Sequence, residues 1–379
     1  MKIVIDENIA FGKEAFSNFG TVIIKNGREI TNETLRDADA LIVRSITRIN
    51  RKLLEGSTIK FVGSATIGVD HVDLDYLREK NIDFANAPGC NSQAVAEYVF
   101  SAIFHLFKKN KLSIKNKSIG IVGAGNIGSK IVKLSKALGL SVFVNDPPLE
   151  RKTGNPNFCS LQDALQADII TFHVPLTMHG KDKTYHLINE NELKNIRPNQ
   201  ILINSSRGPV VNNTALLKRI AGNKDFSIIL DVWENEPVIN LELLKYVDIA
   251  TPHIAGYSLE GKVNGTKMVY EAFCKHFNFK PDWEPPLPEI AKRKIITGNT
   301  ASIDSILQTV FNHVYNIWND DSSMRKLLKI NKENAGKYFD NLRKNYKIRR
   351  ELSNYTVVLN NPAIELIRTL ENFDLKLEF

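Results

Sequence analysis

An arginine, a glutamate and a histidine each follow an apolar run of the sequence, and together they could perform acid–base chemistry on a carboxylic acid. They are Arg207, Glu236 and His253. Histidine titrates in the range where it can take up and return a proton, and a carboxylate beside it stabilises the imidazolium. Arginine binds a carboxylate in a fixed geometry and polarises the adjacent carbonyl. Each residue alone would more often be a surface ion or a core histidine, so the prediction of a catalytic set rests on all three occurring at the edge of one sheet.

A glycine-rich turn supplies the partner for this chemistry. Residues 118–122 are an apolar run, and Gly123-Ala124-Gly125-Asn126-Ile127-Gly128 follows with the spacing G-x-G-x-x-G before a stretch of helical periodicity. In such a turn the first glycine allows the tight bend, the second lets the backbone approach a pyrophosphate, and the third lets the helix pack against the strand. The residues predicted to bind a dinucleotide here are Gly123, Gly125, Asn126, Ile127 and Gly128.

The residue Asp146 indicates which dinucleotide is bound. It ends a second apolar run roughly 20 residues beyond the turn, where a carboxylate accepts hydrogen bonds from the adenosine ribose. This favours NAD, although Arg151 and Lys152 lie close enough in the sequence to leave NADP open. Hydride transfer between nicotinamide and a carbon that bears oxygen requires a group that handles the oxygen's proton. The glycine turn and the acid–base residues together therefore predict a dehydrogenase.

Short apolar runs alternate with helical stretches along most of the chain, which predicts open parallel sheets that bind ligands at the carboxyl ends of their strands. We expect an α/β protein with two doubly wound parallel-sheet domains, an NAD-binding Rossmann domain and a flavodoxin-like substrate domain, plus a small α+β C-terminal domain. A helix at about 260–276 is expected to return to the substrate domain. The predicted boundaries are 1–92 with 258–285 for the substrate domain, 93–257 for the NAD-binding domain and 286–379 for the C-terminal domain.

The composition is typical of a globular protein. Of the 379 residues, 43% are hydrophobic and 24% are charged, and the apolar runs are shorter than the roughly 20 residues of a membrane span. A strand at the N-terminus in place of a signal peptide predicts a cytoplasmic protein. The formal charge of +8 suits an anionic substrate or a basic surface better than nucleic acid, because the basic runs at 108–111 and 343–350 are typical of solvated faces. The cysteines and histidines lack metal-ligand spacing, so no metal is predicted.

Two strand ends in the first part of the chain carry polar groups. Arg44 and Ser45 follow an apolar run, and the glycine-bounded loop at 63–73 could offer backbone N–H groups to a carboxylate or phosphate. On spacing alone, this loop could equally be a solvent-exposed turn. Glu97, in the helical run at 92–109, is interpreted as a helix-surface or capping acid rather than a catalytic one.

Several segments resemble the D-isomer-specific 2-hydroxyacid dehydrogenases, namely the glycine turn, His173-Val174-Pro175-Leu176-Thr177, Asn204-Ser205-Ser206-Arg207-Gly208, Asp231-Val232-Trp233-Glu234-Asn235-Glu236-Pro237 and Thr251-Pro252-His253. The likeness covers essentially the whole chain, and it implies NAD as the cofactor and a small, anionic, phosphorylated hydroxy acid as the substrate. It implies that Arg207, Glu236 and His253 are catalytic. It also implies cofactor contacts from Asp146, Val174, Ser205, Ser206, Arg207, Asp231 and Gly256, and substrate contacts from Ser45, Thr66 and Tyr257.

The same resemblance implies that the C-terminal domain forms a homodimer. The sequence predicts helical stretches there at 302–318 and 334–342 and strands at 355–359 and 374–378, and on this evidence alone the domain could equally be a regulatory or peptide-binding module. Two other functions stay open. One is another enzyme of the family that acts on a different phosphorylated hydroxy acid, and the other is an NAD-sensing corepressor with a dehydrogenase-like fold. The intact catalytic set favours turnover over binding alone.

Overall fold

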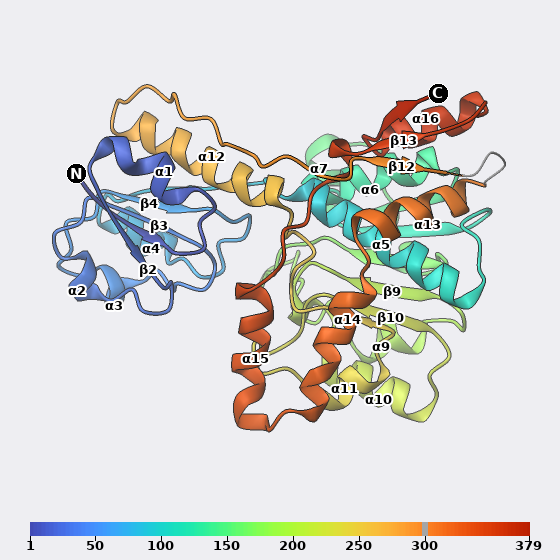
Figure 1. Ribbon diagram of the computed structural model, residues 1–379. Coiled ribbons are helices and arrows are strands. Elements are labelled where there is room, and N and C mark those ends of the chain that lie inside the picture. The colour runs from blue at the N-terminus through green and yellow to red at the C-terminus, as the bar shows by residue number, and fades with distance from the viewer. Residues whose placement is uncertain (298–301) are drawn as a thin grey trace. The chain divides into compact units, whose positions relative to one another are not determined.

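The computed structural model describes residues 1–297 and 302–379. These residues form two compact units, coloured by residue number in Figure 1. Unit 1 consists of Met1–Asn91 and Tyr257–Glu289, and unit 2 consists of Ser92–Gly256 and Ile290–Phe379. We refer to residues 290–379 of unit 2 as the C-terminal segment.

Unit 1 is built on a parallel sheet in the strand order β2-β1-β3-β4-β5. Its central strands are continuous apolar runs because both faces of the sheet are covered, and all four residues of β3 are buried. The strands are β1 (Lys2–Asp6), β2 (Thr21–Lys25), β3 (Ala40–Val43), β4 (Phe61–Ser64) and β5 (Asp83–Asn86), and the helices are α1 (Gly12–Phe16), α2 (Asn32–Leu35), α3 (Arg51–Leu54), α4 (Leu74–Glu79) and α12 (Leu259–His276).

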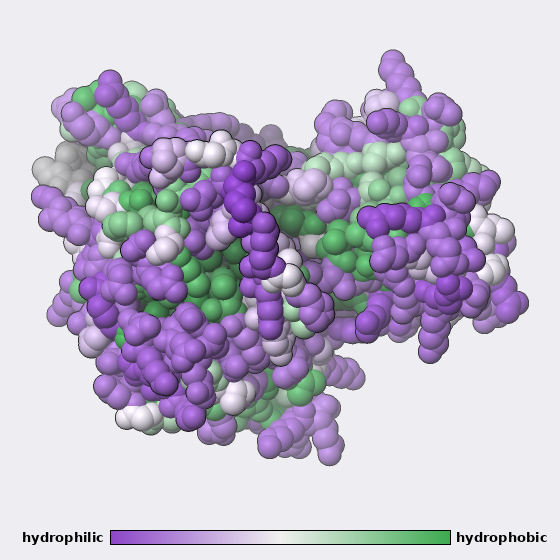
Figure 2. Space-filling model, turned by 180° about the vertical axis from the view of Figure 1, so that it is seen from behind, coloured by the Kyte–Doolittle hydropathy of each residue, from purple (hydrophilic) through white to green (hydrophobic). Residues whose placement is uncertain are grey.

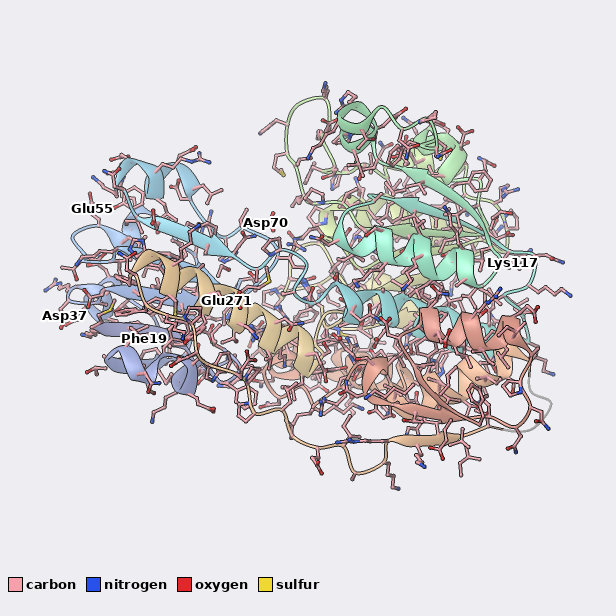
Figure 3. The ribbon with its side chains drawn as sticks, turned by 90° about the horizontal axis from the view of Figure 1, so that it is seen from above. Phe19, Asp37, Glu55, Asp70, Lys117 and Glu271 are labelled. Atoms are coloured by element: carbon pink, nitrogen blue, oxygen red, sulfur yellow. The ribbon has the colours of Figure 1, made fainter. Side chains whose placement is uncertain are left out.

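The long helix α12 packs on the sheet of unit 1 (Figure 1). Its residues Tyr270 and Phe273 are buried in a hydrophobic cluster with Ile42 of β3. Figure 3 shows Phe19 near this helix, which carries Glu271, and the ring centroids of Phe19 and Tyr270 are 5.9 Å apart. The prediction that this helix returns to pack on the first part of the chain is therefore confirmed.

The strand order of unit 1 reverses at β1, which has β2 on one side and β3 on the other. Open α/β sheets bind ligands at such a reversal, outside the carboxyl ends of the strands. Arg44 and Ser45 follow β3 at this point, and Thr66 lies just beyond β4, the next strand of the sheet. The fold thus places Ser45 and Thr66 at the edge where ligands bind in this architecture.

Unit 2 contains a parallel sheet in the strand order β11-β10-β9-β8-β6-β7, so its own reversal lies at β6. Lys117, labelled in Figure 3, comes just before the amino end of β6. The strands are β6 (Ser118–Val122), β7 (Ser141–Asn145), β8 (Ile169–Phe172), β9 (Ile201–Asn204), β10 (Ser227–Leu230) and β11 (Ile249–Ala250), and the helices are α5 (Ser92–Asn110), α6 (Asn126–Ala137), α7 (Pro147–Thr153), α8 (Leu161–Ala164), α9 (Glu190–Lys194), α10 (Asn213–Gly222) and α11 (Leu241–Tyr246). Together with the sheet of unit 1, this sheet confirms the predicted α/β class with parallel sheets.

Helix α5 is buried along most of its length and packs against α6 and against the C-terminal segment. Glu97 on this helix is only 7% exposed. Its Oε1 accepts hydrogen bonds from Gln93 Nε2 at 3.1 Å and from the backbone N–H of Leu352 at 3.0 Å. The interpretation of Glu97 as a helix-surface or capping acid is therefore wrong, because a distant part of the chain covers this side of the helix.

The C-terminal segment adds a small parallel sheet in the order β12-β13-β14 and several helices. Its elements are β12 (Lys294–Ile296), α13 (Ile303–Val314), α14 (Trp318–Arg325), α15 (Lys332–Lys344), β13 (Thr356–Val358), α16 (Ile364–Asn372) and β14 (Lys376–Glu378). The expected solvated face at 343–350 is wrong in part, since Arg349 and Arg350 are only 5% and 8% exposed. These two arginines lie where the segment packs back onto the rest of unit 2.

The face of the molecule in Figure 2 is predominantly hydrophilic, and hydrophobic residues show in separate areas. Across residues 1–297 and 302–379, no helix is long and apolar enough to cross a membrane. Within the same ranges, no group of three or more His, Cys, Asp and Glu side chains is placed to hold a metal ion.

Candidate active site

The carboxyl edge of the unit 2 sheet carries the predicted catalytic and cofactor residues. Residues distant in the sequence come to this edge because their strands are neighbours in a parallel sheet. Across the sheet, the strand ends lead to Asp146 after β7, the glycine turn after β6, Val174 after β8, Ser205, Ser206 and Arg207 after β9, Asp231 and Glu236 after β10, and His253 and Gly256 after β11. One edge therefore combines a turn suited to a dinucleotide with acid–base side chains.

His253 and Glu236 form a direct pair, with Nδ1 of the imidazole 2.7 Å from Oε2 of the carboxylate. The other carboxylate oxygen of Glu236 accepts the backbone N–H of Trp233 at 2.8 Å. The side chains are 32% and 19% exposed, so the pair is accessible but partly shielded from water. Because Nδ1 is engaged by Glu236, Nε2 is the ring nitrogen that can face a substrate.

The environment of Glu236 keeps its carboxylate ionised. Burial by itself would raise the pKa of Glu236, but the nearby His253, the positive charge of Arg343 and the Trp233 N–H together lower this pKa below its usual value. An ionised carboxylate accepts the Nδ1–H and stabilises the tautomer with its lone pair on Nε2. The pair is therefore suited to take a proton at Nε2.

Asp231 fixes the loop that carries His253. Its carboxylate is buried and accepts hydrogen bonds from Thr251 Oγ1 at 2.6 Å and from the backbone N–H groups of Ile254 and Ala255 at 2.7 and 2.9 Å. Its carbonyl oxygen also accepts the N–H of His253 at 2.7 Å. His253 has a φ of 57°, which a side chain with a Cβ rarely adopts unless its surroundings hold it. The cofactor contact expected from Asp231 stays a prediction, while its role in this loop is visible.

Arg207 lies in a tight turn in which the next residue, Gly208, must be glycine. Asn204 Nδ2 donates to the carbonyl oxygen of Arg207 at 2.9 Å, which shapes the turn. A Cβ at Gly208 would lie 2.0 Å from the backbone carbonyl of Trp233. The turn that carries Arg207 therefore packs directly against the segment that follows β10 and leads to Glu236.

The glycine turn has the shape that a pyrophosphate requires. Gly123 has a φ of 94°, and a Cβ at Gly128 would lie 1.9 Å from the Gly123 carbonyl oxygen, so both positions need glycine. At Gly125, by contrast, apart from its two neighbours in the chain, no atom of the described residues lies within 4 Å of the position that a Cβ would take. This open space lies at the start of α6, where backbone N–H groups can bind an anion.

Two further polar groups at this edge of the sheet are suited to contact NAD. The carboxylate of Asp146 accepts the backbone N–H of Ala124 at 2.7 Å and that of Leu149 at 3.0 Å, and each oxygen can accept a further hydrogen bond from a ribose hydroxyl. The hydroxyl of Ser205 is buried and has no hydrogen-bond partner in the described part of the chain. Such a group is usually satisfied by a ligand or water.

A second histidine–carboxylate pair was not predicted from the sequence. His186 Nε2 lies 2.5 Å from Glu234 Oε1, and the remaining polar atoms of both side chains contact Asn212 Nδ2 at 3.1 Å and the N–H of Asn213 at 3.1 Å. This pair therefore joins two loops of the protein. The sequence analysis did not find this pair, because no local signal shows that the loop after β10 brings Glu234 to His186.

His173, in the motif after β8, has a structural role. Its Nε2 lies 2.8 Å from Thr171 Oγ1. Burial lowers the pKa of His173 to about 3, so the ring is neutral at physiological pH. Its backbone packs against the glycine turn, since a Cβ at Gly123 would lie 2.7 Å from the His173 carbonyl oxygen.

In unit 1, two cations gather around Tyr257. Arg44 Nη2 donates to the hydroxyl of Tyr257 at 2.5 Å, and its Cζ lies 5.2 Å from the ring centroid. Lys262 Nζ lies 4.7 Å from the same centroid. Sequence reasoning singled out Arg44 but missed Lys262, whose only sequence signal is its position within the first turns of the helix after Tyr257.

The three residues expected to contact substrate occupy one region of unit 1. Ser45 is exposed just after β3, and Thr66 lies just beyond β4, whose residues pair with those of β3. The hydroxyl of Thr66 contacts that of Ser64 at 2.8 Å. Tyr257 joins this group through Arg44, the neighbour of Ser45 in the chain.

Comparison with known proteins defines the class. Residues 97–255 match the family described as "D-isomer specific 2-hydroxyacid dehydrogenase, NAD binding domain", and residues 286–372 match a domain of unknown function. A solved structure of NAD+-bound 3-phosphoglycerate dehydrogenase from Entamoeba histolytica is similar over 73% of this chain and 95% of its own, with 26% identity and a TM-score of 0.63. The protein is thus an NAD-dependent oxidoreductase with a Rossmann-type NAD-binding sheet, as the sequence predicted.

Two relatives are similar over nearly their whole length. The erythronate-4-phosphate dehydrogenase of Proteus mirabilis (strain HI4320) is 45% identical over 369 residues, which covers 96% of each chain. That of Klebsiella pneumoniae (strain 342) is 44% identical over 376 residues, which covers 98% of this chain and 97% of the relative. The chain therefore belongs to the D-isomer-specific 2-hydroxyacid dehydrogenase family, and within it these erythronate-4-phosphate dehydrogenases are similar over almost the whole chain.

Proposed function

We propose that the protein oxidises 4-phospho-D-erythronate to (R)-3-hydroxy-2-oxo-4-phosphooxybutanoate. The reaction removes a proton from the C2 hydroxyl and a hydride from C2, and NAD, when bound, accepts the hydride. The observation that carries this proposal is the His253–Glu236 pair, 2.7 Å apart, on the sheet edge that also holds Arg207 and the glycine turn. The names of the relatives support this substrate, and the family resemblance implies a step on the route to pyridoxine 5′-phosphate.

The catalytic roles follow from the chemistry of each side chain. His253 Nε2 takes the proton of the substrate hydroxyl, and a positioned base of this kind contributes roughly 10²–10⁴-fold to the rate. Glu236 stabilises the imidazolium that forms. Arg207 binds the substrate carboxylate, whose position next to C2 fixes the reacting carbon, and it polarises the oxygen that becomes the ketone.

The cofactor contacts are assigned to the residues at the strand ends of unit 2. Gly125 leaves open space for the pyrophosphate, and the Asp146 carboxylate is suited to the adenosine ribose. The full proposed set is Gly123, Gly125, Asn126, Ile127, Gly128, Asp146, Val174, Ser205, Ser206, Arg207, Asp231 and Gly256.

The substrate phosphate is assigned to the group around Tyr257. Arg44 and Lys262 place two positive charges against this ring, and Ser45 and Thr66 offer hydroxyls nearby in unit 1. A lysine in the first turns of an 18-residue helix is opposed by the positive end of the helix dipole. A bound dianion would relieve this repulsion, which supports a phosphate at this position.

We also propose three domains: a substrate domain of 1–92 with 258–285, an NAD-binding domain of 93–257 and a C-terminal domain of 286–379. The protein is proposed to form a homodimer through the C-terminal domain. Ile296, Ile364 and Phe379 support an interface there, because they are 80%, 52% and 71% exposed. Light scattering across a range of protein concentrations should give the mass of two chains, and a monomer throughout would contradict this proposal. We expect the enzyme to act in the cytoplasm.

Steady-state kinetics with NAD test the function. 4-Phospho-D-erythronate, D-erythronate and D-3-phosphoglycerate are compared by NADH formation, with a 2-oxo acid present in parallel to regenerate any retained cofactor. The proposal predicts the highest kcat/KM for 4-phospho-D-erythronate. A preference for D-3-phosphoglycerate would assign the activity of a different family member, and a lack of turnover with all three would contradict the proposed reaction.

The phosphate assignment is tested by Lys262→Met in the same assay. Loss of one phosphate contact should raise the KM for 4-phospho-D-erythronate on the order of 10-fold, since a charge-assisted hydrogen bond is worth about 1.5–3 kcal/mol. The KM for D-erythronate, which lacks the phosphate, should stay the same. An equal change for both substrates would contradict the assignment.

A further inference from the structure

We propose that the C-terminal segment positions the catalytic histidine, by holding the strand before His253 and the loop after it. This inference rests on the proposed function for its catalytic meaning. The domain of unknown function, residues 286–372, covers most of this segment. Figure 1 shows α14 and α15 beside the strands and helices of the unit 2 sheet. The contacts on either side of His253 carry the inference.

The first contact holds β11, the edge strand that leads to His253. Asp321 of α14 is 6% exposed, and its Oδ1 accepts the backbone N–H of Ala250 at 2.9 Å. Strand β11 has only two residues and pairs with β10 on one side. On its other side, the Asp321 carboxylate accepts the hydrogen bond that a further strand would otherwise accept. The C-terminal segment thus satisfies the open edge of the sheet beside the catalytic loop.

Arg325 holds Asp321 in place. Its Nε and Nη2 each donate to the Asp321 carboxylate at 2.9 Å, a bidentate geometry. Its guanidinium also donates to the carbonyl oxygen of Leu244 at 3.0 Å and to that of Val247 at 2.6 Å, both just ahead of β11. One arginine therefore fixes both the acceptor for β11 and the turn that enters this strand.

The second contact holds the loop after His253. Arg349 is 5% exposed and donates from Nη2 to the carbonyl oxygen of Ala255, two residues beyond His253. The same nitrogen lies 3.4 Å from the carbonyl oxygen of Ala94 in α5, and the guanidinium carbon lies 4.5 Å from the ring centroid of Tyr315. Ala255 is thereby tied to the longest helix of unit 2.

The choice of arginine at this position has a physical reason. A buried positive charge costs free energy unless its donors are satisfied, and the planar guanidinium can stack on an aromatic ring while its N–H groups reach carbonyl oxygens. Both carbonyl contacts come from Nη2, while the planar group lies over the Tyr315 ring; a lysine ammonium can reach a carbonyl oxygen but has no planar group to stack on the ring. Arginine therefore combines the contact with Ala255 and the packing on Tyr315, and lysine would lose the packing.

The backbone of His253 needs such support. Its φ of 57° is unfavourable for a residue with a Cβ, and conformations of this kind persist only where the surroundings determine them. Tyr98 of α5 and Asp231 after β10 hold Thr251 through hydroxyl contacts of 2.7 and 2.6 Å. The C-terminal segment supplies the contacts at Ala250 and Ala255 that complete this support.

Arg349→Lys and Arg349→Met in the full-length protein test the inference, with Val357→Ala as the matched control. Val357 is buried in the middle strand of the β12-β13-β14 sheet, so its truncation weakens the C-terminal segment away from the His253 loop. The measurements are kcat, KM and the pH profile of 4-phospho-D-erythronate oxidation. Hydrogen exchange of a peptide that spans 250–257 gives a second result that does not depend on activity.

We expect kcat to fall by about 10-fold in Arg349→Lys and up to about 100-fold in Arg349→Met, since small displacements of a catalytic group have effects of this size. The KM for the substrate should change less than kcat, and the acidic limb of the pH profile should move. Exchange of the 250–257 amides should become about 10-fold faster. In Val357→Ala, these values should stay those of the wild type.

Two results would overturn the inference. One is wild-type kcat and wild-type exchange in Arg349→Lys, and this variant alone decides the matter if Arg349→Met does not fold. The other is an equal loss in Val357→Ala, which would mean that general destabilisation is the cause. If the wild type does not oxidise the substrate at all, the proposed function fails, while the exchange measurement still tests the support of the loop.

Discussion

His253 Nδ1 lies 2.7 Å from Glu236 Oε2, although the two residues are 17 positions apart in the sequence. They meet because each follows one of two neighbouring parallel strands, β10 and β11. The same edge continues through Arg207 after β9 to the glycine turn after β6. The order of strands in the sheet, rather than the order of residues in the chain, creates the candidate active site.

The Glu236→Gln variant tests the partnership with His253. The proposed reaction requires neutral His253, so the rate should fall on the acidic side of the pH profile. Glutamine keeps the size and a hydrogen-bond acceptor but lacks the charge that favours the imidazolium, so the histidine loses its proton more readily. The acidic limb of kcat/KM should therefore move to lower pH, and the maximal rate should fall.

The matched control for this experiment is Glu234→Gln. Glu234 pairs with His186 and lies in the same motif as Glu236. The acidic limb should keep its wild-type position in this variant. A shift in Glu234→Gln of the same size as in Glu236→Gln would mean that general effects of charge, and not the His253 pair, set the profile.

Alanine at two positions of the glycine turn should affect different properties, the binding of NAD at Gly125 and the thermal stability at Gly128. A Cβ at Gly125 meets no atom of the described residues within 4 Å other than its chain neighbours, whereas a Cβ at Gly128 would lie 1.9 Å from the Gly123 carbonyl oxygen. Gly125→Ala should keep the wild-type melting temperature but raise the KM for NAD on the order of 10-fold, because the methyl group occupies the space for the pyrophosphate. Gly128→Ala should lower the melting temperature by several degrees, as expected for overpacking of about 1–3 kcal/mol.

Thermal denaturation and NAD titration of both variants check this prediction. Each variant adds the same methyl group, so the pair separates the space for the cofactor from the packing of α6. An unchanged KM for NAD in a folded Gly125→Ala protein would contradict the placement of the pyrophosphate.

Glu97 should make stability depend on pH. Burial and the neighbouring Glu351 raise the pKa of Glu97 to about 8, whereas an unfolded glutamate has a pKa of about 4.3. The folded state therefore binds the proton more tightly, and its stabilising contribution is complete below about pH 4.3 and is lost as the pH rises to about 8. The free energy of unfolding should fall over this window, by up to a few kcal/mol.

Urea denaturation at pH 5.5, 7.0 and 8.5 measures this effect. Glu97→Gln imitates the protonated carboxyl and should flatten the dependence on pH. Glu365→Gln, on an exposed position of α16, should keep the wild-type slope. A wild-type slope in Glu97→Gln would mean that another group is responsible.

The sequence was sufficient to predict the elements that contain local signals. The apolar runs at β1, β3 and β6 and the glycine turn before α6 were found because buried parallel strands are nearly all apolar and the turn needs glycine at fixed positions. Strand ends then indicated which polar residues could share an edge. The pairing of Glu234 with His186 was not predicted, since it depends on the course of the loop after β10.

The C-terminal segment was predicted less well for physical reasons. Helix α14, Trp318–Arg325, consists largely of polar residues and has no apolar period, although Asp320 and Asp321 on it are buried. Arg349 and Arg350 belong to a basic run, which usually lies in solvent. Their burial depends on carbonyl oxygens and rings supplied by distant parts of unit 2, and such contacts leave no signal in the local sequence.

The most direct measurement follows the hydride itself. Wild type and His253→Ala are incubated with NAD and 4-phospho-D-erythronate deuterated at C2, and the reduced cofactor is analysed by mass spectrometry. The proposed reaction predicts that the wild type transfers one deuterium from C2 to the nicotinamide, and that His253→Ala does so at least about 100-fold more slowly while still binding NAD. Reduced cofactor without deuterium, or an equal rate in His253→Ala, would contradict oxidation at C2 with His253 as the base.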